Sequence, residues 1–132
     1  MDSTDKHRST PVAVTIASDQ EPVTCEGVFT RREGGFALEF SIREDTFYID
    51  HNSERTLLKA GGGMSYDLCL CGDKSSTLLG TPYGKIRFDV ITLARDVAED
   101  GDGVHILLRY VLKSVEAGEI ERTVDVSARF MR

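Results

Sequence analysis

Residues 80–84 read Gly-Thr-Pro-Tyr-Gly, and the sequence on both sides of this pentapeptide alternates between apolar and polar residues. Pro82 fixes its own backbone angle φ and biases Thr81 toward an extended conformation. Gly80 and Gly84 permit backbone angles that other residues resist. The pentapeptide therefore predicts a sharp turn between two strands.

The period of two extends over most of the chain. Alternate residues of a strand point to the same face, so this period predicts half-buried strands. Residues 90–99 are the least regular stretch and are also compatible with a helical turn. The apolar positions that carry the period are Val12, Val14 and Ile16; Phe36, Leu38, Phe40 and Ile42; Met64, Tyr66, Leu68 and Leu70; Ile86, Phe88 and Val90; Val104, Ile106, Leu108, Tyr110 and Leu112; and Val124, Val126, Ala128 and Phe130.

Short polar and glycine-containing segments separate these runs, at residues 33–35, 50–53, 72–74, 99–103 and 116–119. Eight to ten short strands joined by tight turns are typical of an antiparallel sandwich or barrel. Closing the sheet removes its exposed edges, so we expect an all-β, single-domain barrel over residues 10–132, with little or no helix. Residues 1–9 are expected to form a flexible tail.

Composition excludes several classes of function. The chain has 132 residues and a net charge of −6, and its longest Lys/Arg cluster is Arg31-Arg32, so neither nucleic acid nor an anionic membrane surface is an expected partner. The polar N-terminus lacks the apolar stretch of a signal peptide, which gives the cytoplasm as the expected location. Three cysteines, an odd number, predict reduced thiols instead of a disulfide framework.

The order of motifs resembles one protein family. The pentapeptide follows Gly61-Gly62-Gly63-Met64 and a strand, and it precedes a strand that begins Lys85-Ile86-Arg87-Phe88. Residues 108–112, Leu-Arg-Tyr-Val-Leu, and residues 118–120, Gly-Glu-Ile, come before the last alternating strand. This arrangement resembles the bacterial YwiB-like family of uncharacterised proteins. The resemblance implies a calycin-like, lipocalin-like β-barrel and carries no catalytic residues, because that family has none assigned.

Three residues are candidates for ligand binding. Tyr83 either folds its ring over a barrel end or contacts a ligand from the rim. Arg109 either lies outward and pairs with a carboxylate such as Asp89 or Asp125, or lies inside. In the interior, Arg109 together with Tyr66 or Tyr83 would bind an anionic ligand.

Four apolar residues are candidates for an interface. Ile91, Leu93, Leu107 and Val111 lie opposite the main apolar set of their strands, where they would form a patch on one hairpin. The partner at such an interface would be a second copy of the chain, forming a homodimer, or another protein. Two alternatives to an interface remain. One is a bulge near Val90 that returns Ile91 and Leu93 to the core, and the other is coverage by the N-terminal segment.

No motif predicts a catalytic residue, a metal or a cofactor. Cys69 and Cys71 share a strand face, but a tetrahedral zinc site needs four ligands and no histidine has a diagnostic spacing. Residues 100–103, Asp-Gly-Asp-Gly, do not align with a calcium-binding loop and predict a solvated turn. We therefore expect a non-catalytic protein that binds a small apolar or amphipathic ligand, or, as the alternative, an interaction protein with a filled barrel. An enzyme ranks last.

Overall fold

The computed structural model describes residues 9–17, 21–62, 65–72, 75–115 and 118–131, which form ten antiparallel strands joined by short turns. The expected tail lies outside the described residues except for Ser9, which begins the first strand. The strands are β1 (Ser9–Ala17), β2 (Val23–Arg32), β3 (Gly35–Ile42), β4 (Asp45–Asn52), β5 (Thr56–Gly61), β6 (Tyr66–Leu70), β7 (Ser75–Thr81), β8 (Gly84–Asp100), β9 (Gly103–Ser114) and β10 (Gly118–Phe130). Within the described ranges there is no helix of the length and hydropathy that crossing a membrane requires.

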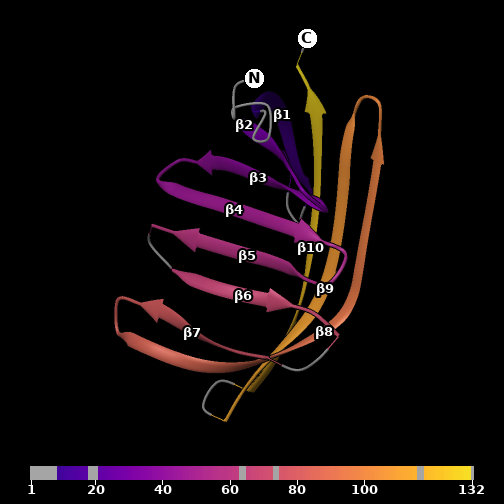
Figure 1. Ribbon diagram of the computed structural model, residues 1–132. Coiled ribbons are helices and arrows are strands. Elements are labelled where there is room, and N and C mark those ends of the chain that lie inside the picture. The colour runs from indigo at the N-terminus through magenta and orange to yellow at the C-terminus, as the bar shows by residue number, and fades with distance from the viewer. Residues whose placement is uncertain (1–8, 18–20, 63–64, 73–74, 116–117, 132) are drawn as a thin grey trace.

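The strands form one sheet that curls into a nearly closed barrel. Their order is β6-β5-β4-β3-β2-β1-β10-β9-β8-β7, and every neighbouring pair is antiparallel. In Figure 1, strands β3 to β7 are stacked above one another, while the long strands β8, β9 and β10 run steeply alongside them. The predictions of an all-β fold, a single barrel and eight to ten strands are confirmed.

The barrel closes between its two terminal strands at a place that we call the seam, the line between β6 and β7. Among the described residues, one isolated bridge joins their ends, where the amide of Gly80 donates to the carbonyl oxygen of Ser65 over 2.8 Å. Further along, side-chain hydroxyls replace the backbone ladder. Thr77 Oγ1 donates to the carbonyl of Asp67 over 2.5 Å, and Ser75 Oγ donates to that of Cys69 over 2.8 Å.

The pentapeptide forms the expected turn. Pro82 and Tyr83 are the two loop residues between β7 and β8, and Thr81 and Gly84 are the first register pair of the hairpin. Gly84 has φ of 125°, a conformation that residues with a Cβ rarely adopt. The sequence predicted that this position needs a glycine, and the positive φ of Gly84 agrees with that prediction.

Residues 90–99 contain no helical turn, since they lie within the 17-residue strand β8. The irregular pattern has another cause, a β-bulge at which the register to β9 shifts between Thr92 and Ala94. The extra residue exchanges the two faces, because each side chain beyond it points to the opposite side. Before the bulge Phe88 and Val90 face inward, and after it Arg95 and Val97 pair with the inward-facing Leu108 and Ile106.

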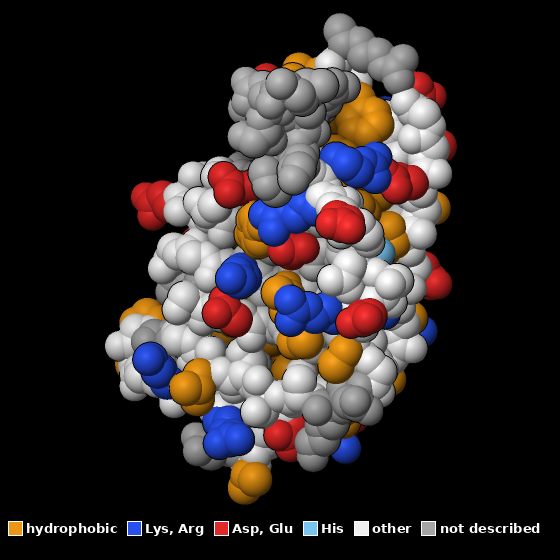
Figure 2. All heavy atoms as spheres, viewed as in Figure 1, with side chains coloured by type: hydrophobic (Ala, Val, Ile, Leu, Met, Phe, Trp, Pro, Cys, Tyr) orange, Lys and Arg blue, Asp and Glu red, His pale blue; other side chains and the backbone are white. Residues whose placement is uncertain are grey.

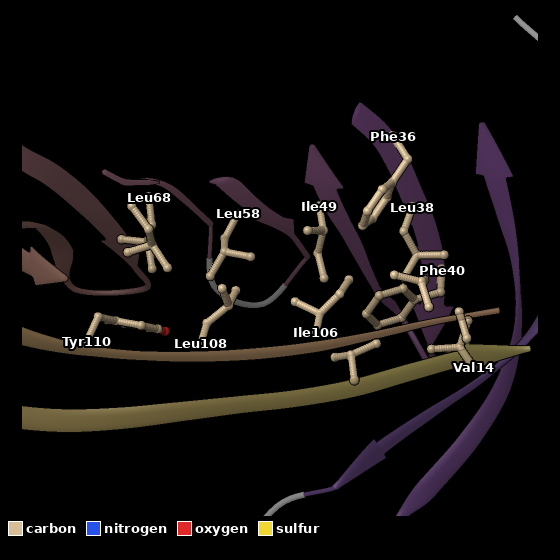
Figure 3. Packing of buried hydrophobic residues seen from close by; sticks show 14 of the residues in the cluster. Val14, Phe36, Leu38, Phe40, Ile49, Leu58, Leu68, Ile106, Leu108 and Tyr110 are labelled. Carbon is tan, nitrogen blue, oxygen red and sulfur yellow. The ribbon is translucent and has the colours of Figure 1, made fainter. Parts of the chain in front are cut away.

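Alternate residues of all the long strands fill the barrel interior, as Figure 3 shows for ten labelled side chains. The most deeply buried include Val14, Leu38, Ile106 and Leu108, each with 0% exposure. Burying side chains of this size contributes about 1.5–3 kcal/mol each, which makes this cluster the main source of stability.

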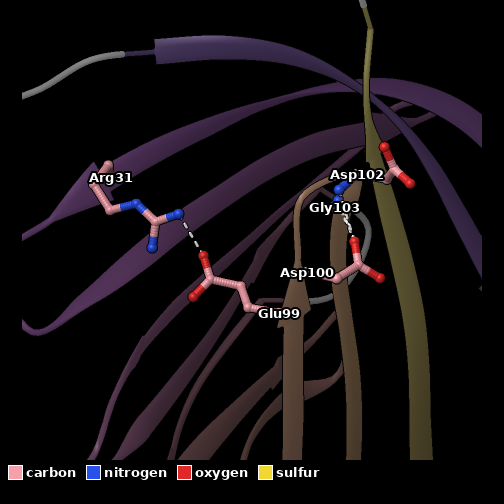
Figure 4. A network of polar contacts seen from close by, with 5 residues as sticks. All are labelled: Arg31, Glu99, Asp100, Asp102 and Gly103. Atoms are coloured by element: carbon pink, nitrogen blue, oxygen red, sulfur yellow. Dashed lines mark hydrogen bonds and ion pairs between the residues drawn. The ribbon is translucent and has the colours of Figure 1, made fainter.

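One end of the barrel is filled by aromatic rings, and we call it the aromatic end. The Phe29 ring lies 5.2 Å from the rings of both Phe36 and Phe130, measured between centroids. Above them, Arg31 covers the Phe29 ring and forms an ion pair with Glu99 of β8 (Figure 4). The rings and the ion pair together close this end.

Candidate functional site

The interior is not filled at the other end of the barrel. A cavity of about 140 Å³ lies there, partly open to the surface. Its walls come from six separate strands and are mainly apolar. Its apolar lining includes Ile16 of β1, Phe40 and Ile42 of β3, Leu58 of β5, and Val124 and Val126 of β10.

Two tyrosines face the interior at this end, which we call the tyrosine end. Tyr66 of β6 lines the cavity, and Tyr110 of β9 is 5% exposed. Figure 3 shows the Tyr110 ring along β9, with its hydroxyl oxygen pointing toward Leu108 among buried aliphatic side chains. Burial raises the pKa of Tyr66 and raises the pKa of Tyr110 to about 12. Both phenols are therefore neutral near pH 7 and can donate a hydrogen bond.

Two charged groups lie near these hydroxyls. Arg122 of β10 is the register partner of Tyr110, and its guanidinium lowers the pKa of both tyrosines against the larger effect of burial. Asp45, at the start of β4, acts in the opposite direction on Tyr66. The tyrosine end thus combines an apolar cavity, two hydroxyls, one cation and one carboxylate.

Of the three predicted ligand-binding residues, only Tyr66 lies at this cavity. Tyr83 is at the tip of the β7–β8 hairpin and is 98% exposed, so its ring does not fold over a barrel end. A contact between Tyr83 and a ligand at the rim stays a prediction.

Arg109 lies on the outer face of β9, which is the first of the two alternatives considered for it. Its neighbours Leu108 and Tyr110 are the residues that point inward. Arg109 pairs with Glu121 on β10, Nη2–Oε2 3.5 Å, and not with the expected Asp89 or Asp125. His105 and Lys113 on the same face also pair with carboxylates of β10, which makes this a solvated, charged surface.

The four predicted interface residues have unequal exposure. Leu93, at the bulge, is 47% exposed, whereas Ile91 and Leu107 are half-buried and Val111 is 7% exposed. Ile91 and Val111 are register partners. The bulge comes after Ile91, so it does not return Ile91 to the core.

A second, wider depression lies outside the barrel along the seam. It has a volume of about 580 Å³ and is lined by Tyr66 and Asp67 of β6, Leu78 of β7, and Lys85 and Arg87 of β8, among others. Tyr66 contributes to both this groove and the interior cavity. On the face shown in Figure 2, acidic and basic side chains are interspersed, with hydrophobic ones visible between them.

The remaining candidates for chemistry have structural explanations. The Cys69 thiol is hydrogen-bonded to Cys71, and burial raises its pKa, which disfavours the reactive thiolate. Asp100 accepts hydrogen bonds from the amides of Asp102 and Gly103 at the β8–β9 turn, over 2.7 and 3.0 Å (Figure 4). Within the described residues, no three metal-ligating side chains come together.

Sequence reasoning missed Tyr110 and Arg122, although both carry a signal. Tyr110 belongs to the alternating set that includes Ile106 and Leu108. Arg122 lies two residues before Val124, so the period of the last strand assigns it to the inward face. A cation that continues the apolar face of a strand at its end is a sequence signal for a charged group beside the barrel interior.

Comparisons with known proteins identify a fold. No family model matches the sequence, and no curated protein matches it. One solved structure, described as the crystal structure of ywiB protein from Bacillus subtilis, superimposes with a TM-score of 0.70 over 98% of each chain, at 12% sequence identity. The likeness to YwiB stated from the sequence is confirmed for the fold.

Proposed function

We propose that this protein is a non-catalytic binding protein for a small apolar or amphipathic molecule held at the tyrosine end. The observation that carries the proposal is the cavity of about 140 Å³ in a barrel whose other end is packed. Atoms that line an empty space lose dispersion contacts, so an apolar occupant restores them. A space of this volume suits one small ring or a chain of several carbons, since a cavity of about 150 Å³ accepts benzene.

The groups around the cavity support binding without chemistry. Tyr66 and Tyr110 are neutral donors, and Arg122 is a cation whose charge acts on both of them. A ligand larger than the cavity would place its apolar part inside and its remaining atoms at the open side. This arrangement favours an amphipathic molecule over a purely apolar one.

The test uses a neutral probe and a variant that fills the space. Val124→Phe places a ring in the cavity, and Thr123→Phe adds the same ring at the exposed neighbouring position as the control. Titration of 1-hexanol, followed by amide NMR shifts, should perturb the residues around the cavity in the wild-type protein and in Thr123→Phe. Val124→Phe should show no such shifts. Equal binding by Val124→Phe, or none by the wild-type protein, would contradict the proposal.

A second function is favoured by the exposed Leu93 at the bulge of β8. Together with the half-buried Ile91 and Leu107, it offers apolar surface on the outside of the barrel. In this alternative the protein acts through self-association.

A further inference from the structure

We infer that Cys69 and Cys71 form a two-ligand binding site for one soft monovalent metal ion, Cu(I). The site lies on the outer face of the barrel, where β6 ends beside the seam. It is separate from the cavity at the tyrosine end, so this inference stands or falls independently of the proposed function.

The first argument is the placement of the two thiols. Leu70 stands between the two cysteines and points inward with 0% exposure. Alternate residues of a strand share a face, so Cys69 and Cys71 both point outward. Their side chains meet there, since the Cys69 thiol is hydrogen-bonded to Cys71. Both cysteines are free and partly exposed, which makes the pair accessible to an ion.

The second argument is that the backbone of both cysteines is held in place. Ser75 Oγ of β7 donates to the carbonyl of Cys69 over 2.8 Å, and the Cys71 amide donates to Thr92 Oγ1 of β8 over 3.2 Å. The pair is thus tied to two other strands at the point where β6 ends. Ligands that are already positioned lose less conformational freedom on binding, so this anchoring favours a tight site.

The third argument is the number and type of the donors. Thiolate sulfur is a soft ligand and selects soft ions such as Cu(I). A structural zinc site needs four ligands, and in the described part of the chain no third metal-ligating side chain joins this pair. Cu(I) has a filled d shell and is stable between two ligands in a linear arrangement. Two thiolates therefore satisfy Cu(I) and leave Zn²⁺ short of ligands.

The fourth argument is charge. As each sulfur binds the ion, its thiol releases a proton to solvent and no electron is transferred, so Cu(I) with two thiolates carries one negative charge. The register between β5 and β6 ends with Thr56 opposite Leu70. Its continuation by one residue places Arg55 opposite Cys71 on the outer face. The Arg55 guanidinium can therefore offset the negative charge of the metal site.

The protonation of the free thiols agrees with this role. Burial raises the pKa of the Cys69 thiol, and the neighbouring Cys71 raises it further, whereas Arg55 and Arg95 act in the opposite direction. The free thiol is therefore a poor nucleophile near pH 7. A bound metal ion displaces the proton, so the same pair still serves as a ligand.

The experiment titrates the reduced protein with Cu(I) under anaerobic conditions, in competition with a chromogenic Cu(I) chelator. We expect the wild-type protein to bind one ion per chain. Cys69→Ser and Cys71→Ser should each weaken binding by more than about a hundredfold, since even the outer-shell partners of metal ligands contribute about 10–100-fold. Cys25→Ser is the matched control and should bind as wild type, because Cys25 lies on β2 and strands β3, β4 and β5 separate it from β6.

Arg55→Gln tests the compensating charge and keeps both thiols. It should weaken Cu(I) binding by about tenfold. Lys59→Gln is its matched control, because Lys59 lies on the same strand opposite Asp67 and should not affect the ion. Circular dichroism checks the fold of each variant, and the Arg55 pair keeps the test decisive if a cysteine variant fails to fold. X-ray absorption at the copper edge should show two sulfur neighbours.

Several results would overturn the site. These are no Cu(I) binding by the wild-type protein, undiminished binding by Cys69→Ser or Cys71→Ser, and loss of binding in Cys25→Ser. Three or four neighbours around the copper, or displacement of Cu(I) by an equal concentration of Zn²⁺, would show a different ligand set and would also contradict the inference.

Discussion

Thr77 on β7 donates its hydroxyl to the carbonyl oxygen of Asp67 on β6, at an Oγ1–O distance of 2.5 Å. The bond stands where the backbone ladder of the barrel is interrupted, and Thr77 is only 9% exposed. In the seam, a side-chain hydroxyl therefore donates the hydrogen bond between strands that backbone amides donate elsewhere in the barrel. Removing it leaves a partly buried carbonyl without this donor.

Thr77→Val should lower the free energy of unfolding by about 1–2 kcal/mol, because the replacement keeps the shape and deletes one buried hydrogen bond. Urea denaturation measures the loss, and hydrogen exchange should show faster exchange in β6 and β7. Thr46→Val is the control, since Thr46 makes an exposed hydroxyl contact with Ser41 between two laddered strands. Equal losses for both variants would show that the seam bond has no special role.

Arg95 bridges the barrel from β8 to the β4–β5 turn. Its guanidinium donates to Thr56 Oγ1 over 3.2 Å and to the Ser53 carbonyl over 3.1 Å. Arg95→Met keeps much of the aliphatic stem but removes these bonds, so we expect a loss of about 2–3 kcal/mol in the free energy of unfolding. The control Arg87→Met, at an exposed site with a long contact of 3.5 Å to Ser76, should change stability by less than about 0.5 kcal/mol. An unchanged free energy of unfolding in Arg95→Met would contradict the bridging role.

Tyr110 makes the free energy of unfolding depend on pH in the alkaline range. Its pKa is raised to about 12 by burial, whereas an unfolded tyrosine ionises near pH 10. Below about pH 10 both states hold the proton. Between about pH 10 and 12 only the unfolded state loses it, so the free energy of unfolding falls as pH rises, by up to about 2–3 kcal/mol.

Tyr110→Phe should lose this part of the pH dependence, measured by urea denaturation at pH 9 and pH 11.5. Tyr83→Phe is the control, because the Tyr83 ring is exposed before and after unfolding. The control should retain the wild-type difference between the two pH values. An unchanged difference in Tyr110→Phe would show that other groups cause the alkaline loss.

The Leu93 patch is tested by its state of association. If the protein acts through self-association, it should elute at twice 14.6 kDa, and Leu93→Lys should elute as a folded monomer. Val111→Lys should instead unfold the protein, because Val111 is 7% exposed and packs beside Ile91. Scattering combined with size-exclusion chromatography gives the mass directly. A monomeric wild-type protein would rule out this second function.

Periodicity predicted most of the fold, because a period of two identifies strands wherever one face is buried. It did not reveal the bulge at Thr92 and Ala94, since a single extra residue looks like noise in an alternating pattern. It also left the face of Arg109 undecided. Strand β9 has apolar residues on both sides, among them Leu107 and Val111, and only the register with β10 identifies the inner one.

The candidate site was predicted only in part. Tyr66 follows from the alternation of β6, but its proximity to Tyr110 depends on the barrel closing at the seam. Closure joins strands that are distant in the sequence, and a local pattern carries no information about that pairing. The cavity likewise reflects the volumes of side chains from six strands, which no single segment encodes.

The aromatic end has a consequence for the rate of ligand exchange. Since Phe29, Phe36 and Phe130 fill the barrel there, and Arg31 and Glu99 pair above them, a molecule in the cavity leaves by the side through which it entered. A competitor therefore cannot displace it from behind and must wait for an empty cavity. The observed exchange rate should equal the dissociation rate and remain constant however much competitor is added.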